Sequence, residues 1–293
     1  MSFINLSNHS AENWSKEQMG AAMAYGNQIY DCSFPNINPH ASKQEISELA
    51  ERYCQELKAE NPTAVMVQGE MTFTHDLVSR LQAEGIKCLA ACSERKTMEQ
   101  QLPDGTTKKT AAFEFCGFRE YGEAQRNFEK KGRENREPAP VFVNLSAHPS
   151  ERWSKEQSEA AKAYGDITDI RFPNINPHAT SKDVDALADQ YLDQIKEMNP
   201  SVVMVQGEMT FTHDLVSKLQ EEGIKCVAAC SDRKTVEEQL TDGSTKKTAI
   251  FEFCGFREYN EPEREPELEK GIDTEHEEEV SVHSDNEEEE ELE

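Results

Sequence analysis

The chain has 293 residues and a formal net charge of −26 at pH 7, and this charge is unevenly distributed. Residues 260–293 contain 17 acidic and two basic side chains, which leaves a net charge of −11 on the rest of the chain. Because a strongly acidic protein repels a polyanion, we expect no binding of long nucleic acid. No stretch reaches the roughly 18 apolar residues of a membrane helix, and no secretory leader is recognisable, so we expect a cytoplasmic protein without membrane contact.

The sequence contains two copies of one unit. NLSNH at 5–9 returns as NLSAH at 144–148, and VMVQGEMTFTHDLVS at 65–79 is unchanged at 203–217. Such a long period exceeds that of solenoid repeats and indicates duplicated domains. We predict a first domain at 1–121, a charged linker at 122–139, a second domain at 140–259 and a disordered acidic tail at 260–293. The alternative role for the tail is docking to a basic partner.

Each copy alternates strand patterns with helix patterns. In the first copy, short apolar runs predict strands at 3–6, 29–34, 64–67 and 87–91. Apolar residues at helical spacing predict helices at 15–25, 42–61 and 72–84. This alternation favours parallel strands with right-handed crossovers. The predicted fold class is therefore α/β, with two tandem Rossmann-like domains.

Local signals mark several element boundaries. Ser42 followed by Glu45 is a capping-box pattern at the start of the second helix. Thr72 is the expected N-cap of the third helix. Asp104–Gly105 lies between two β-rich runs, 97–102 and 110–115, as a hairpin turn does.

Cysteines and known motifs narrow the chemistry. Cys88 and Cys92 lie four residues apart, which is not the CxxC spacing of zinc sites or redox pairs, so we expect small buried thiols. The histidines, cysteines and carboxylates show no metal-ligand spacing, and neither GxGxxG nor GxxxxGK[ST] occurs. We therefore expect neither a metal nor a cofactor.

Three polar loops follow predicted strands in each copy, where sheets of this class bind ligands. The first loop contributes Ser7, Asn8 and His9, with Ser146 and His148 in the second copy. The second loop contributes Gln68, Gly69, Glu70 and Thr72, with Gln206, Gly207, Glu208 and Thr210. The third loop contributes Ser93, Arg95 and Lys96, with Ser231, Arg233 and Lys234. Glycine permits close backbone approach, a helix start offers N–H groups to an anion, and Arg and Lys suit phosphate.

Each of these residues also has a purely structural interpretation. Ser7 is equally a turn or cap residue, because serine at a strand end bonds readily to nearby backbone. His75, in the first turn of the third helix, is read as a solvated or capping residue rather than a base. Arg95 and Lys96 are alternatively charges that solvate a loop.

The stretch VMVQGE…LVSRLQAEGIKCLAACSERK, followed by LPDGTTKKTAAFEF and GFREY, resembles the standalone CRISPR-associated ring nucleases of the Csx type, relatives of the CARF sensor domains. The resemblance covers both repeats. Those proteins are single units that pair as homodimers, whereas this chain carries two units. Ser93 also stands where the resemblance leads us to expect threonine. The resemblance implies two CARF-like domains that form an intramolecular pseudo-dimer, in a monomeric protein whose partner is a cyclic oligoadenylate.

The activity implied by the resemblance is ring cleavage that switches off type III CRISPR signalling, with cyclic tetra-adenylate as the substrate. The residues permit a metal-independent reaction, in which a ribose 2′-OH attacks its own phosphate in line. Helix-start amides at Thr72 and Thr210 would hold phosphate oxygens. Arg95 and Arg233 would stabilise the transition state, and Lys96 and Lys234 would bind substrate. His9 and His148 are the candidates for proton transfer.

Two alternatives to an enzyme remain open. The first is a module that binds or sequesters the cyclic nucleotide without cutting it. The second is a structural or partner-binding protein whose polar loops bind no ligand. The absence of a recognisable nucleotide-binding sequence motif favours this interpretation.

Overall fold

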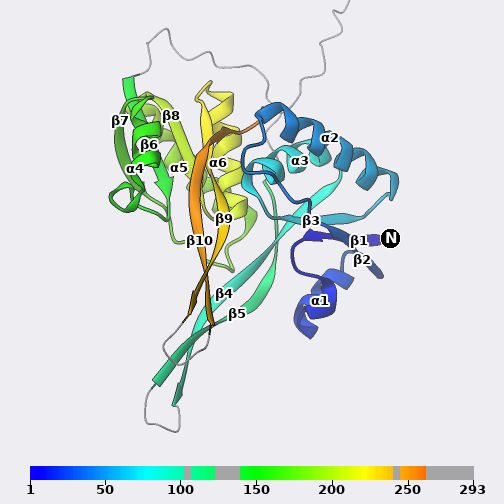
Figure 1. The fold of residues 1–293 in the computed structure, drawn as a ribbon. Coiled ribbons are helices and arrows are strands. Elements are labelled where there is room, and N and C mark those ends of the chain that lie inside the picture. Colours follow the sequence, from blue (N-terminus) through cyan, green and yellow to red (C-terminus); the bar gives the residue numbers. More distant parts are fainter. Residues whose placement is uncertain (102–106, 123–138, 240–244, 262–293) are drawn as a thin grey trace, which may run out of the picture. The chain divides into compact units, whose positions relative to one another are not determined.

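The computed structural model describes residues 1–101, 107–122, 139–239 and 245–261 (Figure 1). The first repeat contains β1 (Ser2–Ser7), α1 (Lys16–Met23), β2 (Gln28–Ser33), α2 (Lys43–Ala59), β3 (Ala64–Gln68), α3 (Met71–Ala83), β4 (Lys87–Gln101) and β5 (Thr107–Glu120). The second contains β6 (Ala139–Ser146), α4 (Lys155–Lys162), β7 (Asp166–Arg171), α5 (Ser181–Met198), β8 (Pro200–Gln206), α6 (Met209–Glu221), β9 (Cys226–Gln239) and β10 (Thr245–Glu258). The predicted order of strands and helices is confirmed.

Each repeat forms its own five-stranded sheet, and the two sheets have the same topology. The order is β2-β1-β3-β4-β5 in the first repeat and β7-β6-β8-β9-β10 in the second. In the first repeat β2, β1, β3 and β4 are parallel, and β5 is antiparallel to β4. The predicted α/β class is therefore confirmed as two Rossmann-like units in tandem.

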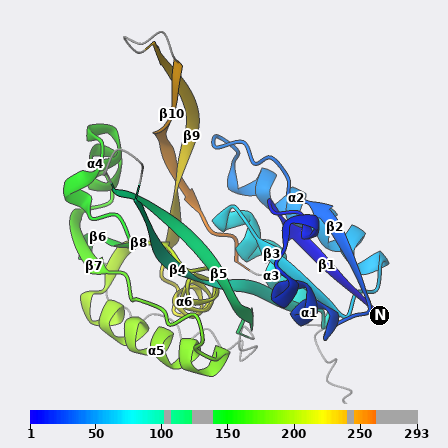
Figure 2. The ribbon, with the colours of Figure 1, turned by 90° about the horizontal axis from the view of Figure 1, so that it is seen from below.

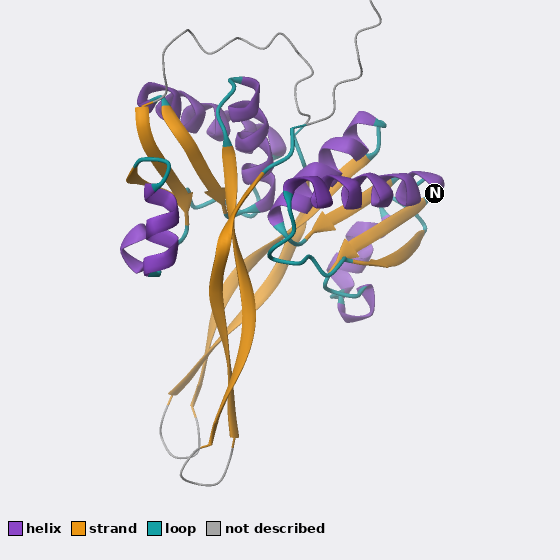
Figure 3. Cartoon of the chain, turned by 45° about the horizontal axis from the view of Figure 1, so that its top comes forward, coloured by secondary structure: helices purple, strands orange, loops and turns teal. Residues whose placement is uncertain are grey.

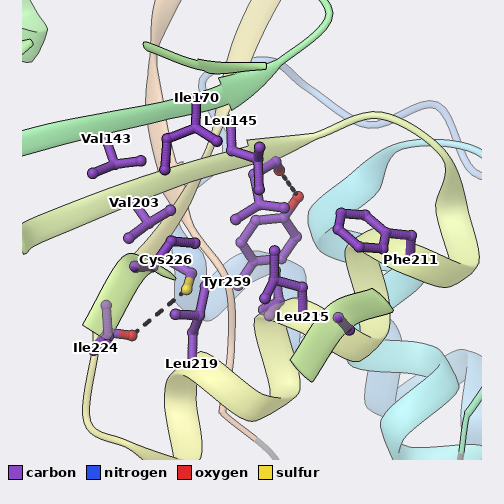
Figure 4. Packing of buried hydrophobic residues seen from close by; sticks show 14 of the residues in the cluster. Val143, Leu145, Ile170, Val203, Phe211, Leu215, Leu219, Ile224, Cys226 and Tyr259 are labelled. Carbon is purple, nitrogen blue, oxygen red and sulfur yellow. Dashed lines mark hydrogen bonds between the residues drawn. The ribbon is translucent and has the colours of Figure 1, made fainter. Parts of the chain in front are cut away.

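Helices cover both faces of each sheet, as a parallel sheet requires. In the first repeat Ile46 of α2 and Leu77 of α3 pack on one face, while α1 contributes Ala22 to a cluster on the other. Figure 4 shows the equivalent core of the second repeat, where the Tyr259 ring lies among the side chains of β6, β8 and α6. Its hydroxyl donates to the Val205 carbonyl at 2.8 Å, which satisfies the one polar atom of this buried ring.

The element boundaries agree with the sequence where a local motif sets them. The capping box of Ser42 and Glu45 is present. The expected cap at Thr72 is wrong: the side chain of Glu70 accepts from the Phe73 amide at 2.9 Å, so α3 begins at Met71. The fourth strand also runs well past its predicted end at 91, because β5 pairs with it from Leu89 to Gln101. The predicted turn at Asp104–Gly105 lies outside the described residues.

Burial accounts for the cysteines. Cys88, Cys92, Cys226 and Cys230 are buried, and every cysteine of the chain is free. Burial raises the pKa of the Cys92 thiol to about 11, so it stays protonated at neutral pH. The prediction of buried thiols is confirmed for these four residues.

Met1–Pro262 make up one compact unit that contains both repeats. Most of the predicted linker and tail lies outside the described residues. None of the helices in the described part of the chain is long and apolar enough to cross a membrane.

Candidate functional site

A cleft of about 930 Å³ lies at the carboxyl ends of β1 and β3, beside the middle of β4. Residues of the second repeat, including Ile175 and Pro177, complete its wall. Of the predicted site residues it brings together Ser7, Asn8, His9, Gln68, Gly69, Ser93, Gly207 and Glu208. Sheets of this class bind ligands at this position, because the strand ends converge there.

The loop after β1 is held by a polar network that begins inside the strand. Asn5 is buried and donates to Asp31 at 2.6 Å and to the His9 carbonyl at 2.8 Å. The Ser7 hydroxyl donates to Asn5 at 2.8 Å and accepts from the His9 amide at 3.2 Å. Ser7 thus acts as a turn residue, the structural interpretation of this position. His9 is exposed and lies on the cleft wall.

Asp31 anchors this loop from the neighbouring strand β2. Its partial burial raises the pKa, but hydrogen bonds from the Ala11 amide, Asn5 and Ser10 outweigh burial and hold the pKa below its usual value. Asn144 and Asp169 repeat the arrangement in the second repeat. Sequence reasoning missed both pairs, although an asparagine within an apolar strand in both copies was the available signal.

The loop after β3 does not form the anion-binding site expected there. A Cβ atom on Gly69 would lie 2.3 Å from the Phe34 ring, so packing against this ring requires the glycine. The carboxylate of Glu70 caps α3 and also accepts from the Thr72 hydroxyl at 2.9 Å. Gly207, Phe172, Glu208 and Thr210 repeat these contacts. The expectation that Thr72 and Thr210 mark helix starts open to phosphate is therefore wrong, because a carboxylate of the chain already occupies each one.

Two buried arginines join the repeats reciprocally, and no sequence-based site included them. Arg119, on the cleft wall, donates to Glu208 at 3.1 Å and Thr210 at 3.2 Å, and to the carbonyls of Asn176 and Ala179. Arg257 makes the matching contacts with Glu70, Thr72, Asn38, Pro39 and Ala41 of the first repeat. The recurring GFREY motif was the signal for these residues.

Two histidines meet between the repeats. The rings of His75 and His213 lie 4.8 Å apart, and His75 is only 2% exposed. The interpretation of His75 as a solvated or capping residue is therefore wrong. Burial lowers the pKa of His75 to about 4, so the ring is neutral at physiological pH.

The third loop is the start of a long hairpin, and only Ser93 of its predicted residues lines the cleft. Arg95 and Lys96 are exposed further along β4, and Lys96 pairs with Glu114. In the second repeat Arg233 is exposed and Lys234 pairs with Glu252. The other predicted residues outside this cleft are Glu70, Thr72, Ser146, His148, Gln206, Thr210 and Ser231.

Fold and cleft together define a duplicated α/β protein with a cleft that residues of both repeats line. The chain belongs to the Uncharacterized protein MJ1673 family, whose family model matches residues 1–119 and again residues 140–257. A search of curated proteins found no match.

Among solved structures, the chain is similar to the Acinetobacter baumannii Cap4 SAVED/CARF-domain containing receptor. The complex with the cyclic trinucleotide 2′3′3′-cAAA has 10% identity and a TM-score of 0.36, over 88% of this chain and 50% of that chain. The complex with 3′3′3′-cAAA has 10% identity and a TM-score of 0.36, over 88% and 51%. The chain thus spans about half the length of these receptors. Neither match names a ring nuclease, so that resemblance remains a prediction.

Proposed function

We propose that the cleft binds a cyclic oligonucleotide, and that this ligand is a cyclic oligoadenylate such as cyclic tetra-adenylate. The observation that carries the proposal is the lining, in which Trp14, Phe113 and Phe115 lie among neutral polar side chains such as Asn8 and Gln68. Aromatic rings stack on bases, while amides and hydroxyls hydrogen-bond to ribose and phosphate oxygens. A volume of about 930 Å³ is near the upper end of the roughly 300–1,000 Å³ range of ligand sites.

The charge of the cleft is compatible with an anionic ligand. Glu208 is the one carboxylate among the described residues that line it, and Arg119 pairs with that carboxylate at 3.1 Å. The pair is close to neutral, so the wall does not repel a phosphate. A ring binds here without the strong basic patch that a long polyanion needs.

The duplication supports a ring-shaped ligand. A ring of identical nucleotides has rotational symmetry, and two like units facing each other present equivalent groups to opposite nucleotides. The reciprocal contacts of Arg119 and Arg257 join two such units within one chain. On this proposal the repeats act as an intramolecular pseudo-dimer, and a monomer suffices for binding.

Calorimetric titration with cyclic tri-, tetra- and hexa-adenylate tests the proposal, with linear tetra-adenylate as the ligand control. Ser93→Phe fills the cleft from β4, whereas Glu94→Phe places the same ring one residue along, on the opposite face of the strand. We expect one ring to bind, and Ser93→Phe to weaken it at least tenfold relative to Glu94→Phe. Failure of every ring to bind, or equal effects of both substitutions, would overturn the proposal.

A second candidate function is cleavage of the bound ring, and the position of His9 favours it. His9 is exposed on the cleft wall, where its imidazole can accept a proton from a ribose 2′-OH or donate one to the leaving oxygen. In-line attack by the 2′-OH breaks the phosphorus–oxygen bond to the next ribose and leaves a 2′,3′-cyclic phosphate. This reaction requires positioning and proton transfer, so cleavage should proceed in a chelator.

Product analysis separates cleavage from sequestration. We expect His9→Ala to slow ring opening by roughly 10²-fold, a typical effect of removing a general acid or base, while the ring still binds. His40→Ala, which removes an exposed histidine that does not line the cleft, is the matched control. If the wild-type protein binds a ring and releases no linear product, the chain is a binding or sequestering protein.

A further inference from the structure

The hairpin formed by β4 and β5 has two faces, and the register assigns side chains to each. Ser93 pairs with Phe115 and Arg95 pairs with Phe113. Directly paired residues of an antiparallel pair project to the same side, and successive residues alternate between sides. Ser93, Arg95, Phe113 and Phe115 therefore share one face.

This shared face is the one that looks into the cleft. Ser93, Phe113 and Phe115 all line the cleft, and all three belong to it. Arg95 lies on the same face, directly opposite Phe113, which lines the cleft. Lys96 and Glu114 project from the opposite face, where they pair with each other.

Neither Phe113 nor Arg95 has a ring or ion-pair partner among the residues that the structure describes. Phe113 is 72% exposed, and it makes no ring contact among the described residues, whereas Phe115 packs on Phe118 at 5.0 Å. Arg95 is exposed and forms no ion pair with the described part of the chain. An exposed ring beside an unpaired guanidinium suits a nucleotide, since the ring stacks on the base and the guanidinium binds phosphate.

The second repeat contains the same arrangement. Arg233 pairs with Phe251 across β9 and β10, and Phe251 is 68% exposed. Lys234 and Glu252 pair on the opposite face, as their counterparts do. Figures 1 and 3 show both hairpins projecting beyond the sheets on the same side of the molecule. Figure 2 shows the β4–β5 hairpin running from the first sheet toward the second repeat.

We infer that Arg95 with Phe113, and Arg233 with Phe251, are nucleotide-binding platforms in which phenylalanine stacks on an adenine and arginine contacts the adjoining phosphate. The inference rests on the proposed ring-binding function and adds the residues that recognise the bases. Phe113 already lines the cleft, so a ligand held there extends onto this surface. On this inference each hairpin contacts one part of the ring, and the β9–β10 hairpin does so outside the described cleft.

The test is the affinity for cyclic tetra-adenylate of Phe113→Leu combined with Phe251→Leu. Leucine keeps an apolar side chain and removes the aromatic face, so we expect at least tenfold weaker binding, in line with the loss of base stacking. Phe113→Trp with Phe251→Trp should keep the affinity of the wild type. Glu114→Leu with Glu252→Leu makes equally exposed apolar substitutions on the far face and should not weaken binding.

Substitution of the two arginines provides an independent test. We expect Arg95→Gln with Arg233→Gln to weaken binding and to reduce its dependence on salt concentration, because two phosphate contacts are lost. If the wild type binds the ring and the double leucine variant binds it with the same affinity, the nucleotide-binding platforms are wrong. The ring-binding function then still stands. If the wild type binds no cyclic adenylate, both proposals fall together. Unaltered thermal unfolding of the variants shows that the hairpins remain folded.

Discussion

Helices α3 and α6 have nearly the same sequence but different surroundings. MTFTHDLVSRLQA at 71–83 and MTFTHDLVSKLQE at 209–221 differ at only two positions. Even so, Asp76 accepts from Arg80 at 2.8 Å and from the Asn260 side chain, whereas one carboxylate oxygen of Asp214 has no hydrogen-bond partner. The difference arises from one position within the helices, Arg80 against Lys218, and from residues outside them.

One partner of each aspartate follows the last strand of the other repeat. Asn260 donates its side-chain amide to Asp76, but its counterpart Gly122 offers Asp214 only a backbone N–H at 3.1 Å. Lys218, the counterpart of Arg80, pairs with Asp185 and Asp189 instead. Duplication thus preserves the fold of each repeat, while single substitutions in one repeat change the electrostatics of the other.

The largest expected effect comes from breaking the reciprocal arginine contacts. Arg257→Ala removes a buried guanidinium and leaves Glu70, Thr72 and three backbone carbonyls short of a donor. We expect the free energy of unfolding to fall by about 3–5 kcal/mol, as measured by urea denaturation. Arg119→Ala should have a similar effect, because it makes the matching contacts.

Lys87→Ala is the control for both arginines, because Lys87 makes an ion pair with Glu120 at a mostly exposed site. Its loss should cost less than about 1 kcal/mol. If the arginine variants are as stable as this control, the guanidinium contacts do not hold the repeats together. A large difference between Arg119→Ala and Arg257→Ala would show that the two repeats are not equivalent at this contact.

The second prediction concerns Asp214, whose surroundings raise its pKa. Burial is the main cause, the charge of Asp185 adds to it, and the pKa rises from 3.8 to about 7. The folded protein then binds a proton that the unfolded chain releases, so stability declines as pH rises from about 4 to about 7. Asp214→Asn should abolish this component, which at about 1.4 kcal/mol per pKa unit amounts to roughly 4 kcal/mol at most.

The measurement is the difference in unfolding free energy between wild type and Asp214→Asn as a function of pH. We expect the variant to gain stability relative to the wild type between pH 4 and 7, and the difference to stay constant above pH 8. Asp76→Asn is the matched control, and it should be destabilising because it leaves Arg80 without a buried charged partner. A difference curve for Asp214→Asn that is flat with pH would contradict the assigned pKa.

The sequence predicted those features that depend on neighbouring residues. Ser42 and Glu45 set a helix start because both are within one turn, and the apolar run 64–67 indicates a buried strand in any context. His75 was misread because the residues that bury it belong to the other repeat. Arg119 was missed for the same reason, since its partners are more than 50 positions away. Local sequence patterns predict helices and strands, but they do not indicate which surfaces of the two repeats contact each other.

The smallest expected effect is a difference in stability between substitutions of the two tryptophans, Trp14 and Trp153, which occupy equivalent positions in the two repeats. The Trp153 indole N–H donates to the His148 carbonyl at 3.1 Å, whereas the buried Trp14 N–H has no hydrogen-bond partner. Phenylalanine removes the N–H and much the same apolar area at both sites. We therefore expect Trp153→Phe to be less stable than Trp14→Phe by about 1 kcal/mol, the net contribution of one hydrogen bond.

Urea denaturation of both variants measures this difference directly, because the loss of ring area is common to them and cancels. Trp14→Phe should be close to neutral after that correction, since an unpaired buried donor contributes no favourable hydrogen bond to lose. Equal destabilisation would mean that the Trp14 N–H has a partner in solution. Trp14 lines the cleft, so adding a cyclic adenylate offers a second comparison. If the Trp14 ring stacks on a base, the ligand stabilises the wild type more than Trp14→Phe, while Trp153→Phe responds as the wild type does.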